Sequence, residues 1–306
     1  MPKDIADIAP IALFAYNRPD HMLRSVEALA KNPEAVRSRL FVFSDAPKSI
    51  SAVEQVTRVR ALSHEIKGFL SVEVIEQADN QGVARSIIQG VGRLVEQFGK
   101  AIVLEDDLLP SQHFLEYMNR ALDRYEHDER VISVHAYSYP VSGVLPETFF
   151  LRGADCWGWA TWKRGWRLFE ADGRKLLREL EHRKLGYEFD LDGSYPYSRM
   201  LRDCIDGKND SWAIRWYASA FLLGKLTLYP GSSQVRNIGA DGSGVHLRAT
   251  RSFEHGRWGK RVTVGEIPVE ESDYSRRAFA AFLSELRSSP VKRALKRVAA
   301  LFEGKS

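Results

Sequence analysis

Short apolar runs alternate with amphipathic stretches through about the first hundred residues of the chain. Four runs have the length and composition of buried strands: residues 8–16, 40–44, 70–75 and 101–104. Apolar side chains recur at helical spacing between them, in residues 20–31, 51–68 and 83–98. Parallel strands need crossover connections and are covered on both faces, so these consecutive βα units predict an α/β fold. Its sheet is expected to be mainly parallel, Rossmann-like and flanked by helices.

Polar side chains follow each predicted strand at the point where the strand ends. They are Asn17 and Arg18, Ser44 and Asp45, Asp79 and Asn80, and the triplet Glu105-Asp106-Asp107. The carboxyl ends of parallel strands meet at one edge of a sheet, and ligands of such sheets bind there. We therefore expect these polar clusters to converge on one rim.

The pattern changes from about residue 130 onward. It predicts strands at 131–137, 148–151 and 227–229, helices at 170–184 and 212–223, and a flexible loop at 239–244. We divide the chain into a first half at residues 1–150, a smaller second half at 151–275, and a basic amphipathic tail at 276–306.

Composition narrows the classes of protein that fit. The net charge of +4 over 306 residues is small for a protein that would neutralise many phosphates, which disfavours a nucleic-acid partner. Cys156 and Cys204 have no metal-ligand or redox spacing. No apolar run approaches the length of a membrane span, and residues 1–10 lack the basic region of a secretory signal. We expect a cytoplasmic protein.

The triplet Glu105-Asp106-Asp107 is the strongest chemical signal in the sequence. Three adjacent carboxylates at the end of an apolar strand repel one another unless a cation offsets them. Mg²⁺ and Mn²⁺ typically take one or two carboxylates together with substrate phosphates, so a metal and a nucleotide diphosphate fit this position. The alternative is a solvated acidic turn that caps the next helix, although capping needs one acid only.

A second signal is the segment 155–162, which holds three indoles. Aromatic faces stack on sugar rings, so Trp157 or Trp159 is a candidate for lining a sugar site. The alternative is that these rings fill a core beside the sheet, and we expect at least two of the tryptophans at 157, 159, 162 and 166 to do so.

In these features the chain resembles the GT-A nucleotide-sugar glycosyltransferases, and among them N-acetylglucosaminyltransferase I. The resemblance runs over residues 8–247, through AYNRP, VARSIIQGVGRLVEQF, IVLEDDL, CWGWATWKRGW, NDSWAIRW and SQVRNIGADGSGVH. It implies a GT-A type fold with a nucleotide-sugar-binding first half and an acceptor-binding, catalytic second half. It also implies Mn²⁺ or Mg²⁺, a nucleoside diphosphate sugar donor, with UDP favoured, and a carbohydrate acceptor.

Carried over by position, the resemblance suggests Asp107 as the metal ligand, with Glu105 and Asp106 meeting the donor sugar and ribose. Two strand-end residues, Arg18 and Asp45, match positions that contact the nucleotide base. For these two the alternatives are a solvated loop cation and a turn residue. The resemblance also places Arg85 in the helix that flanks the nucleotide pocket. His246 lies in a glycine-rich stretch at 237–246 that suits a lid over the donor. This histidine would contact the diphosphate or the metal, and the alternative is a structural role.

An inverting transferase needs one base that takes the proton of the acceptor hydroxyl. Asp210 is our candidate, in a stretch where the family carries two acids before a Trp. Here Ser211 stands in place of the second acid, which leaves the base open. The alternative is that Asp210 caps the helix that follows.

Residues 291–302 alternate cations with apolar residues at helical spacing. Such a helix suits peripheral contact with an anionic membrane face, or packing on the catalytic domain or a second subunit. Three rival functions remain: a sugar-phosphate nucleotidyltransferase, a glycoside hydrolase, and a non-catalytic carbohydrate-binding protein that kept the fold. The first usually has a glycine-rich basic loop after its first strand, where this chain has Asn17-Arg18-Pro19. The second needs paired carboxylates but no metal–diphosphate cluster.

Overall fold

The computed structural model describes residues 8–239 and 257–288. Its main sheet has eight strands in the order β3-β2-β1-β4-β8-β6-β9-β7. These strands are β1 (Ile11–Ala15), β2 (Arg39–Ser44), β3 (Ser71–Glu76), β4 (Lys100–Glu105), β6 (Val131–His135), β7 (Thr148–Arg152), β8 (Trp159–Trp162) and β9 (Leu226–Pro230). A second sheet pairs β5 (Leu108–Pro110) with β10 (Val235–Asn237). The strands β1 to β4 are all parallel, as is the pair β6 and β9, so the predicted mainly parallel α/β sheet is confirmed.

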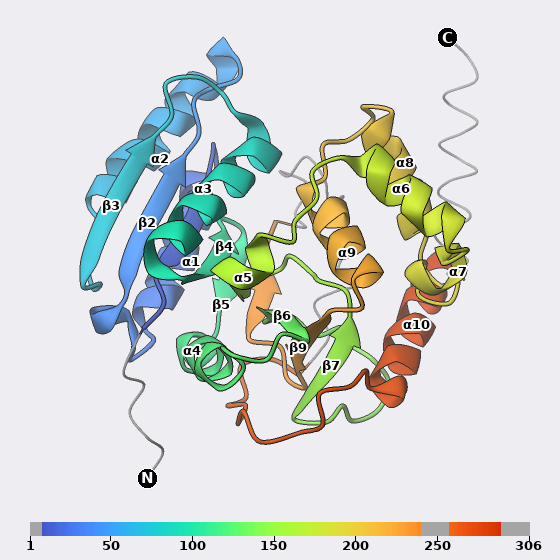
Figure 1. Ribbon diagram of the computed structural model, residues 1–306. Coiled ribbons are helices and arrows are strands. Elements are labelled where there is room, and N and C mark those ends of the chain that lie inside the picture. Colours follow the sequence, from blue (N-terminus) through green and yellow to red (C-terminus); the bar gives the residue numbers. More distant parts are fainter. Residues whose placement is uncertain (1–7, 240–256, 289–306) are drawn as a thin grey trace.

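Helices cover both faces of this sheet (Figure 1). They are α1 (Pro19–Ala30), α2 (Val53–His64), α3 (Gly82–Phe98), α4 (Phe114–Arg124), α5 (Lys163–Trp166), α6 (Gly173–His182), α7 (Gly186–Phe189), α8 (Tyr197–Ile205), α9 (Trp212–Leu222) and α10 (Asp273–Ser288), with 3-10 turns η1 (Ala35–Arg37) and η2 (Ile50–Ala52). Figure 1 shows β3 and β2 at one end of the sheet and β7 at the other, with α6 and α8 beside α9.

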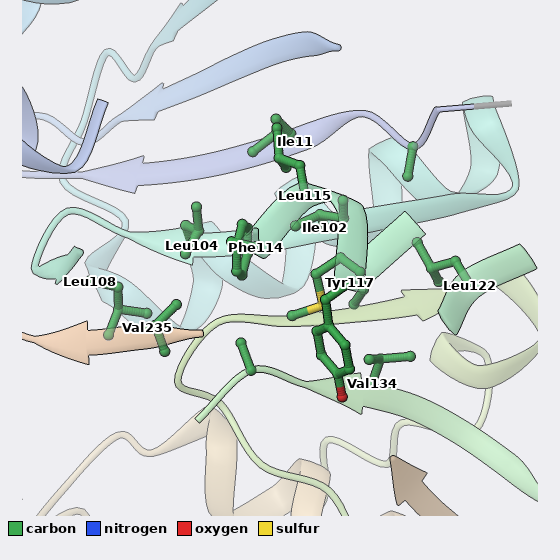
Figure 2. Close-up of a cluster of buried hydrophobic side chains, with 14 of the residues drawn as sticks. Ile11, Ile102, Leu104, Leu108, Phe114, Leu115, Tyr117, Leu122, Val134 and Val235 are labelled. Atoms are coloured by element: carbon green, nitrogen blue, oxygen red, sulfur yellow. The ribbon is translucent and has the colours of Figure 1, made fainter. Parts of the chain in front are cut away.

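One face of the sheet packs against α1, α2 and α4, because alternate strand residues point to the same side. Figure 2 shows this layer, in which Phe114, Leu115 and Tyr117 of α4 lie against Ile102 and Leu104 of β4. All five side chains are buried. The carboxyl end of β4 is therefore anchored in the core directly before the acidic triplet.

The opposite face packs against α3 and α9. Phe14 and Phe43 stack on this side with ring centroids 4.9 Å apart. A Cβ on Gly90 would lie 2.7 Å from the Phe14 ring, so α3 approaches the sheet closely only because glycine stands there. Helix α3 ends at Phe98, and Gly99, whose φ of +79° is left-handed, turns the chain directly into β4.

The structure corrects the predicted elements at several places. Strand β6 ends at His135, short of residue 137. The helix expected over 51–68 begins as η2 and ends at His64. Helix α4 and the β5–β10 pair were not predicted.

Residue 150, at which we divide the chain into two halves, lies within β7. Strand β8 of the second half lies antiparallel between β4 and β6 of the first half. Its sequence WATW is buried throughout, with Trp159 in one core layer and Trp162 in the other. The two halves therefore share one sheet.

Some predicted features cannot be placed. The loop from residue 240, including His246, and the basic stretch 291–302 lie outside the described residues. Among the residues that the structure does describe, no helix is both long and apolar enough to cross a membrane.

Candidate active site

The predicted convergence of polar clusters on one rim is confirmed. The backbone N–H of Asp106 donates to the carbonyl of Phe14, at 3.0 Å, and that of Asp45 donates to the carbonyl of Ala15, at 3.1 Å. The backbone N–H of Tyr16 donates to Asp106 Oδ2, at 3.2 Å. These bonds join the carboxyl ends of β1, β2 and β4 at one edge of the sheet.

Arg18 lies directly on the acidic triplet. Its Nη2 is 2.6 Å from Asp106 Oδ1 and 3.1 Å from Asp107 Oδ2. The residue before a proline favours extended backbone, and Arg18, with φ −122° and ψ 73°, precedes Pro19 at the start of α1. Because its side chain is only 20% exposed and paired twice, the alternative of a solvated loop cation is wrong.

The electrostatics of the triplet are unbalanced. Burial, with the charges of Asp107 and Asp106, raises the pKa of Glu105 to about 8. Burial also raises the pKa of Asp106 to about 6, although Arg18 opposes that shift. Burial lowers the pKa of Arg18, but the two carboxylates outweigh burial and raise it overall. One guanidinium thus leaves an excess of negative charge that a further cation would offset.

The backbone that follows β10 packs against Asp107. The backbone N–H of Ile238 donates to the carbonyl of Asp107, at 2.8 Å. A Cβ on Gly239 would lie 2.3 Å from Asp107 Oδ2 and 2.9 Å from Arg18 Nη1. Only glycine fits this close approach. Arg18 Nη1 is itself buried and has no hydrogen-bond partner among the described residues.

The triplet offers few protein ligands for a metal ion. Within residues 8–239 and 257–288, no group of three or more His, Cys, Asp or Glu side chains is placed to hold one. Mg²⁺ is usually held by one or two carboxylates plus substrate phosphates and water. Asp107, half-buried at the rim beside an under-neutralised pair of acids, fits that mode of binding.

Asp45 has a different environment. Its Oδ1 accepts the backbone N–H groups of Ala46 and Gln81, both at 2.8 Å. Its Oδ2 accepts Asn80 Nδ2, at 3.0 Å, and the backbone N–H of Gly82, at 2.9 Å. A carboxylate has about four acceptor sites, so its capacity is used. This geometry favours the turn-residue alternative over contact with a nucleotide base.

Arg85 lies on α3, the helix whose first N–H groups Asp45 caps. Its side chain is exposed, close after the start of the helix. The structure therefore leaves Arg85 accessible to solvent, and its contact with a nucleotide stays a prediction.

The two candidate tryptophans differ. Trp159 is 1% exposed, with ring centroids 5.3 Å from Trp212 and 5.5 Å from Trp166, so it is a core residue. Trp162 and Trp166 are buried too, which confirms that at least two of these rings fill the core. Trp157 is half-buried and is the one of the two candidates that keeps exposed surface.

Asp210 lies at the start of α9. Its side chain is 69% exposed, and Oδ1 is 3.2 Å from Arg215 Nη2. Ser211 Oγ accepts the backbone N–H of Ile214, at 3.2 Å, so Ser211 caps α9 and the alternative of Asp210 as the cap is wrong.

Sequence reasoning missed a carboxylate beside Trp157. Asp155 begins the aromatic segment, and its Oδ1 lies 3.9 Å from Nε2 of the buried His135. Nothing in the local sequence distinguishes Asp155 from a turn residue, because its neighbours come from distant parts of the chain.

Comparison with known proteins gives a limited result. No protein-family model matches the chain, and no curated protein matches it. Among solved structures, the mannosyltransferase PcManGT from Pyrobaculum calidifontis, in complex with GDP-Man and Mn²⁺, is 13% identical over 45% of this chain, with a TM-score of 0.33. TarS from S. aureus, residues 1–349, is 12% identical over 48% of this chain, with a TM-score of 0.32.

The chain spans 38% and 41% of these two structures, well under two thirds of either. The first is a mannosyltransferase and the second is TarS. Neither is N-acetylglucosaminyltransferase I, so the resemblance to that enzyme stays a prediction. At this level of similarity, the function of the chain has to be inferred from its own site.

Proposed function

We propose that this protein is a metal-dependent, inverting glycosyltransferase. It moves a sugar from a nucleoside diphosphate donor, with UDP favoured, to a hydroxyl of a carbohydrate acceptor. The observation that carries the proposal is the acidic triplet at the carboxyl edge of the parallel sheet, where Glu105 and Asp106 have raised pKa values and Arg18 is the paired cation.

In this proposal Asp107 holds Mn²⁺ or Mg²⁺, which, when bound, offsets the charge of the departing diphosphate. Asp106 is held by Arg18 and by the Tyr16 backbone, so its orientation is set before substrate binds. Glu105 and Asp106 accept hydrogen bonds from hydroxyls of the donor sugar and ribose. Those bonds orient the anomeric carbon toward the second half of the molecule.

Asp210 is the proposed base. Its exposed carboxylate takes the acceptor proton as the acceptor oxygen forms its bond to the anomeric carbon. The bond between the anomeric carbon and the phosphate oxygen breaks in the same displacement, and the diphosphate leaves with the bonding electron pair.

We also propose that residues 291–302 make peripheral contact with an inner membrane face.

The experiment is calorimetric titration of the full chain with UDP and with GDP, with and without Mn²⁺. We expect Mn²⁺-dependent binding of a nucleoside diphosphate, and its loss in Asp107→Ala. Asp20→Ala is the matched control, because that aspartate is 81% exposed on α1. Binding that ignores both the metal and Asp107→Ala would overturn the proposal.

Product analysis separates the rival enzymes. Incubation with nucleotide sugars and Mn²⁺ is expected to release free nucleoside diphosphate. Release of pyrophosphate from a nucleoside triphosphate and a sugar phosphate would identify a nucleotidyltransferase. Sugar binding without turnover of any donor would identify a binding protein.

A further inference from the structure

A cavity lies between helix α1 and strand β5, away from the residues that the proposed function uses. Its volume is about 500 Å³, which is within the range of small-molecule sites. One wall is a face of α1, and a second is the chain from Leu109 to Gln112. Trp258 and Gly259 form the third wall.

The α1 wall carries charged side chains on one helical face. Arg24, Glu27 and Lys31 follow one another at spacings of three and four residues, which put side chains on the same side of a helix. Ala28 lies between them, and its small side chain leaves the space in front of the helix open. The three charged residues are exposed, and within residues 8–239 and 257–288 none of them forms an ion pair. Two cations and one acid give this wall a net positive charge.

Trp258 supplies the aromatic surface of the cavity. The guanidinium carbon of Arg236, on β10, lies over its ring at 4.0 Å from the centroid, so a cation covers one face of the indole. Trp258 also forms a β-bridge with Ser233, and the backbone N–H of Gly259 donates to the carbonyl of Ser233, at 2.9 Å. The indole is half-buried and is held in place where it borders the cavity.

Hydrogen bonds fix the three walls relative to one another. Ser111 Oγ donates to Gln234 Oε1, at 2.7 Å, and Gln234 Nε2 donates to the carbonyl of Lys260, at 2.8 Å. Asn32 Nδ2, just after α1, donates to the carbonyl of Ser111, at 2.9 Å. The cavity is therefore formed before a ligand enters, and binding requires little ordering of the protein.

The cavity is separate from the acidic triplet, although α1 borders both. Arg18 pairs with the triplet at the start of α1, and Lys31 follows the last residue of the helix. At a rise of about 1.5 Å per residue, these two positions are about 20 Å apart along the helix axis. Between them, His21 Nε2 lies 3.3 Å from the carbonyl oxygen of Ile238, so α1 contacts the chain after β10 there.

The side chains around the cavity select a particular ligand chemistry. Arg24 and Lys31 attract a negatively charged group, whereas Glu27 repels a ligand with many negative charges and accepts hydrogen bonds from hydroxyls. The indole packs on the apolar face of a ring. A pyranose with one anionic group has all three features: a C–H face, hydroxyl donors and a single charged substituent.

We propose that this cavity binds a pyranose that carries one anionic group, a carboxylate or a phosphate. Arg24 and Lys31 pair with the anionic group, Glu27 accepts a hydroxyl hydrogen bond, and Trp258 packs on the sugar ring. This site does not rest on the proposed function, because it needs neither the metal nor the nucleotide.

The test is saturation-transfer NMR of the full chain without metal or nucleotide. The probes are methyl β-D-glucuronide, methyl α-D-galacturonide and glucose 6-phosphate, each compared with its neutral counterpart. We expect transfer to the ring protons of at least one anionic probe, with binding about five-fold weaker or less for the neutral sugar, as for loss of an exposed ion pair. The anionic probe that binds best identifies the group as a carboxylate or a phosphate.

Variants of the α1 wall test the role of its cations. Arg24→Gln and Lys31→Gln change exposed side chains, and each should weaken binding of the anionic probe by about three-fold. Arg58→Gln is the matched control, because that arginine is 51% exposed on α2, and it should leave binding unchanged. No transfer to any anionic probe, or equal binding in the wild type and both α1 variants, would overturn the site.

Trp258→Leu tests the aromatic wall. It should weaken binding of the sugar by about five-fold, the scale of one aromatic contact. Inorganic phosphate that displaces the sugar, together with unchanged sugar binding in Trp258→Leu, would reduce the cavity to a simple anion site and overturn the assignment to a pyranose. Calorimetry with UDP and Mn²⁺ on the same samples reports on the transferase alone, so the two proposals can fail separately.

Discussion

The carboxylate of Asp45 and the triplet Glu105-Asp106-Asp107 lie at the same rim, and their surroundings differ. Asp45 accepts four hydrogen bonds from backbone and amide donors around the start of α3. At the end of β4, three carboxylates have one guanidinium among them, and burial keeps the pKa of Glu105 and of Asp106 raised. The carboxylate of Asp45 has hydrogen-bond partners within the protein for both of its oxygens. The triplet keeps more negative charge than the described protein groups offset, and in the proposed function a cation and a ligand complete it.

The largest effect is expected for Asp107→Asn. Losing the carboxylate that we place on the metal should lower the rate of sugar transfer by about 10²–10³-fold, the usual range for loss of one strong electrostatic contact in a transition state. The folded state should keep its stability, because a like charge leaves the triplet. Rates of nucleoside diphosphate release and urea denaturation of the same sample measure both quantities. Full activity in Asp107→Asn would contradict the view that the triplet binds the metal whereas Asp45 only stabilises the fold.

Asp45→Ala should have the opposite profile. The N–H groups of Gln81, Gly82 and Ala46 would lose their acceptor, which should lower the free energy of unfolding by about 3 kcal/mol. UDP binding, measured below the unfolding transition, should change little. Asp20→Ala is the control for removing a negative charge. Unchanged stability with lost UDP binding would instead assign Asp45 to the nucleotide base.

Gly239→Ala probes the close approach over Asp107. The added Cβ would lie 2.3 Å from Asp107 Oδ2, so that side chain has to move. We expect Mn²⁺-dependent UDP affinity to fall by about ten-fold, which is about 1.4 kcal/mol. Gly265→Ala is the matched control, because a Cβ there meets no atom within 4 Å. Equal affinities in the two variants would argue against a role for Gly239 in shaping the site.

A smaller effect is expected from pH. The pKa of Glu105 is raised from an ordinary value of 4.5 to about 8, so the folded state binds its proton more tightly than the unfolded chain does. Stability should therefore fall as pH rises from about 4.5 to about 8, by on the order of 1 kcal/mol after allowance for solvent screening. Urea denaturation at pH 5.5 and 8.5 measures the loss.

Glu105→Gln should remove most of that dependence, because the amide does not titrate. Adding Mn²⁺ and UDP to the wild type should also reduce the change of stability with pH, because a bound cation favours the ionised triplet. A wild-type protein that gains stability from pH 5.5 to 8.5, with Glu105→Gln following the same curve, would contradict the electrostatic description of the site.

Prediction from sequence succeeded where the signal is local. The parallel strands of the first half are buried on both faces and form continuous apolar runs, such as β1 and β4. The positions of Asp45 and Asp107 at strand ends followed directly. Helix α4 carries an apolar stripe as well, but the triplet and β5 lead into it without a side-chain cap that marks its start.

Contacts between distant residues could not be predicted in the same way. Arg18 and Asp106 are 88 positions apart, and their pairing depends on β1 lying beside β4. No feature of the local sequence distinguishes Trp159 from Trp157. Strand β8 pairs with β4 in the interior of the sheet, and this position buries Trp159. The environment of Asp155 depends on where β6, β8 and α8 meet, which no spacing in the sequence shows.

Proton release on metal binding tests the central claim most directly. Calorimetric titration with UDP and Mn²⁺ at pH 7, in buffers of different ionisation enthalpy, counts the protons that leave the protein. A cation at the triplet favours the ionised form of Glu105, whose pKa is raised to about 8, so about one proton per site should be released. Binding of UDP and Mn²⁺ without proton release, or with equal release in Glu105→Gln, would contradict the account.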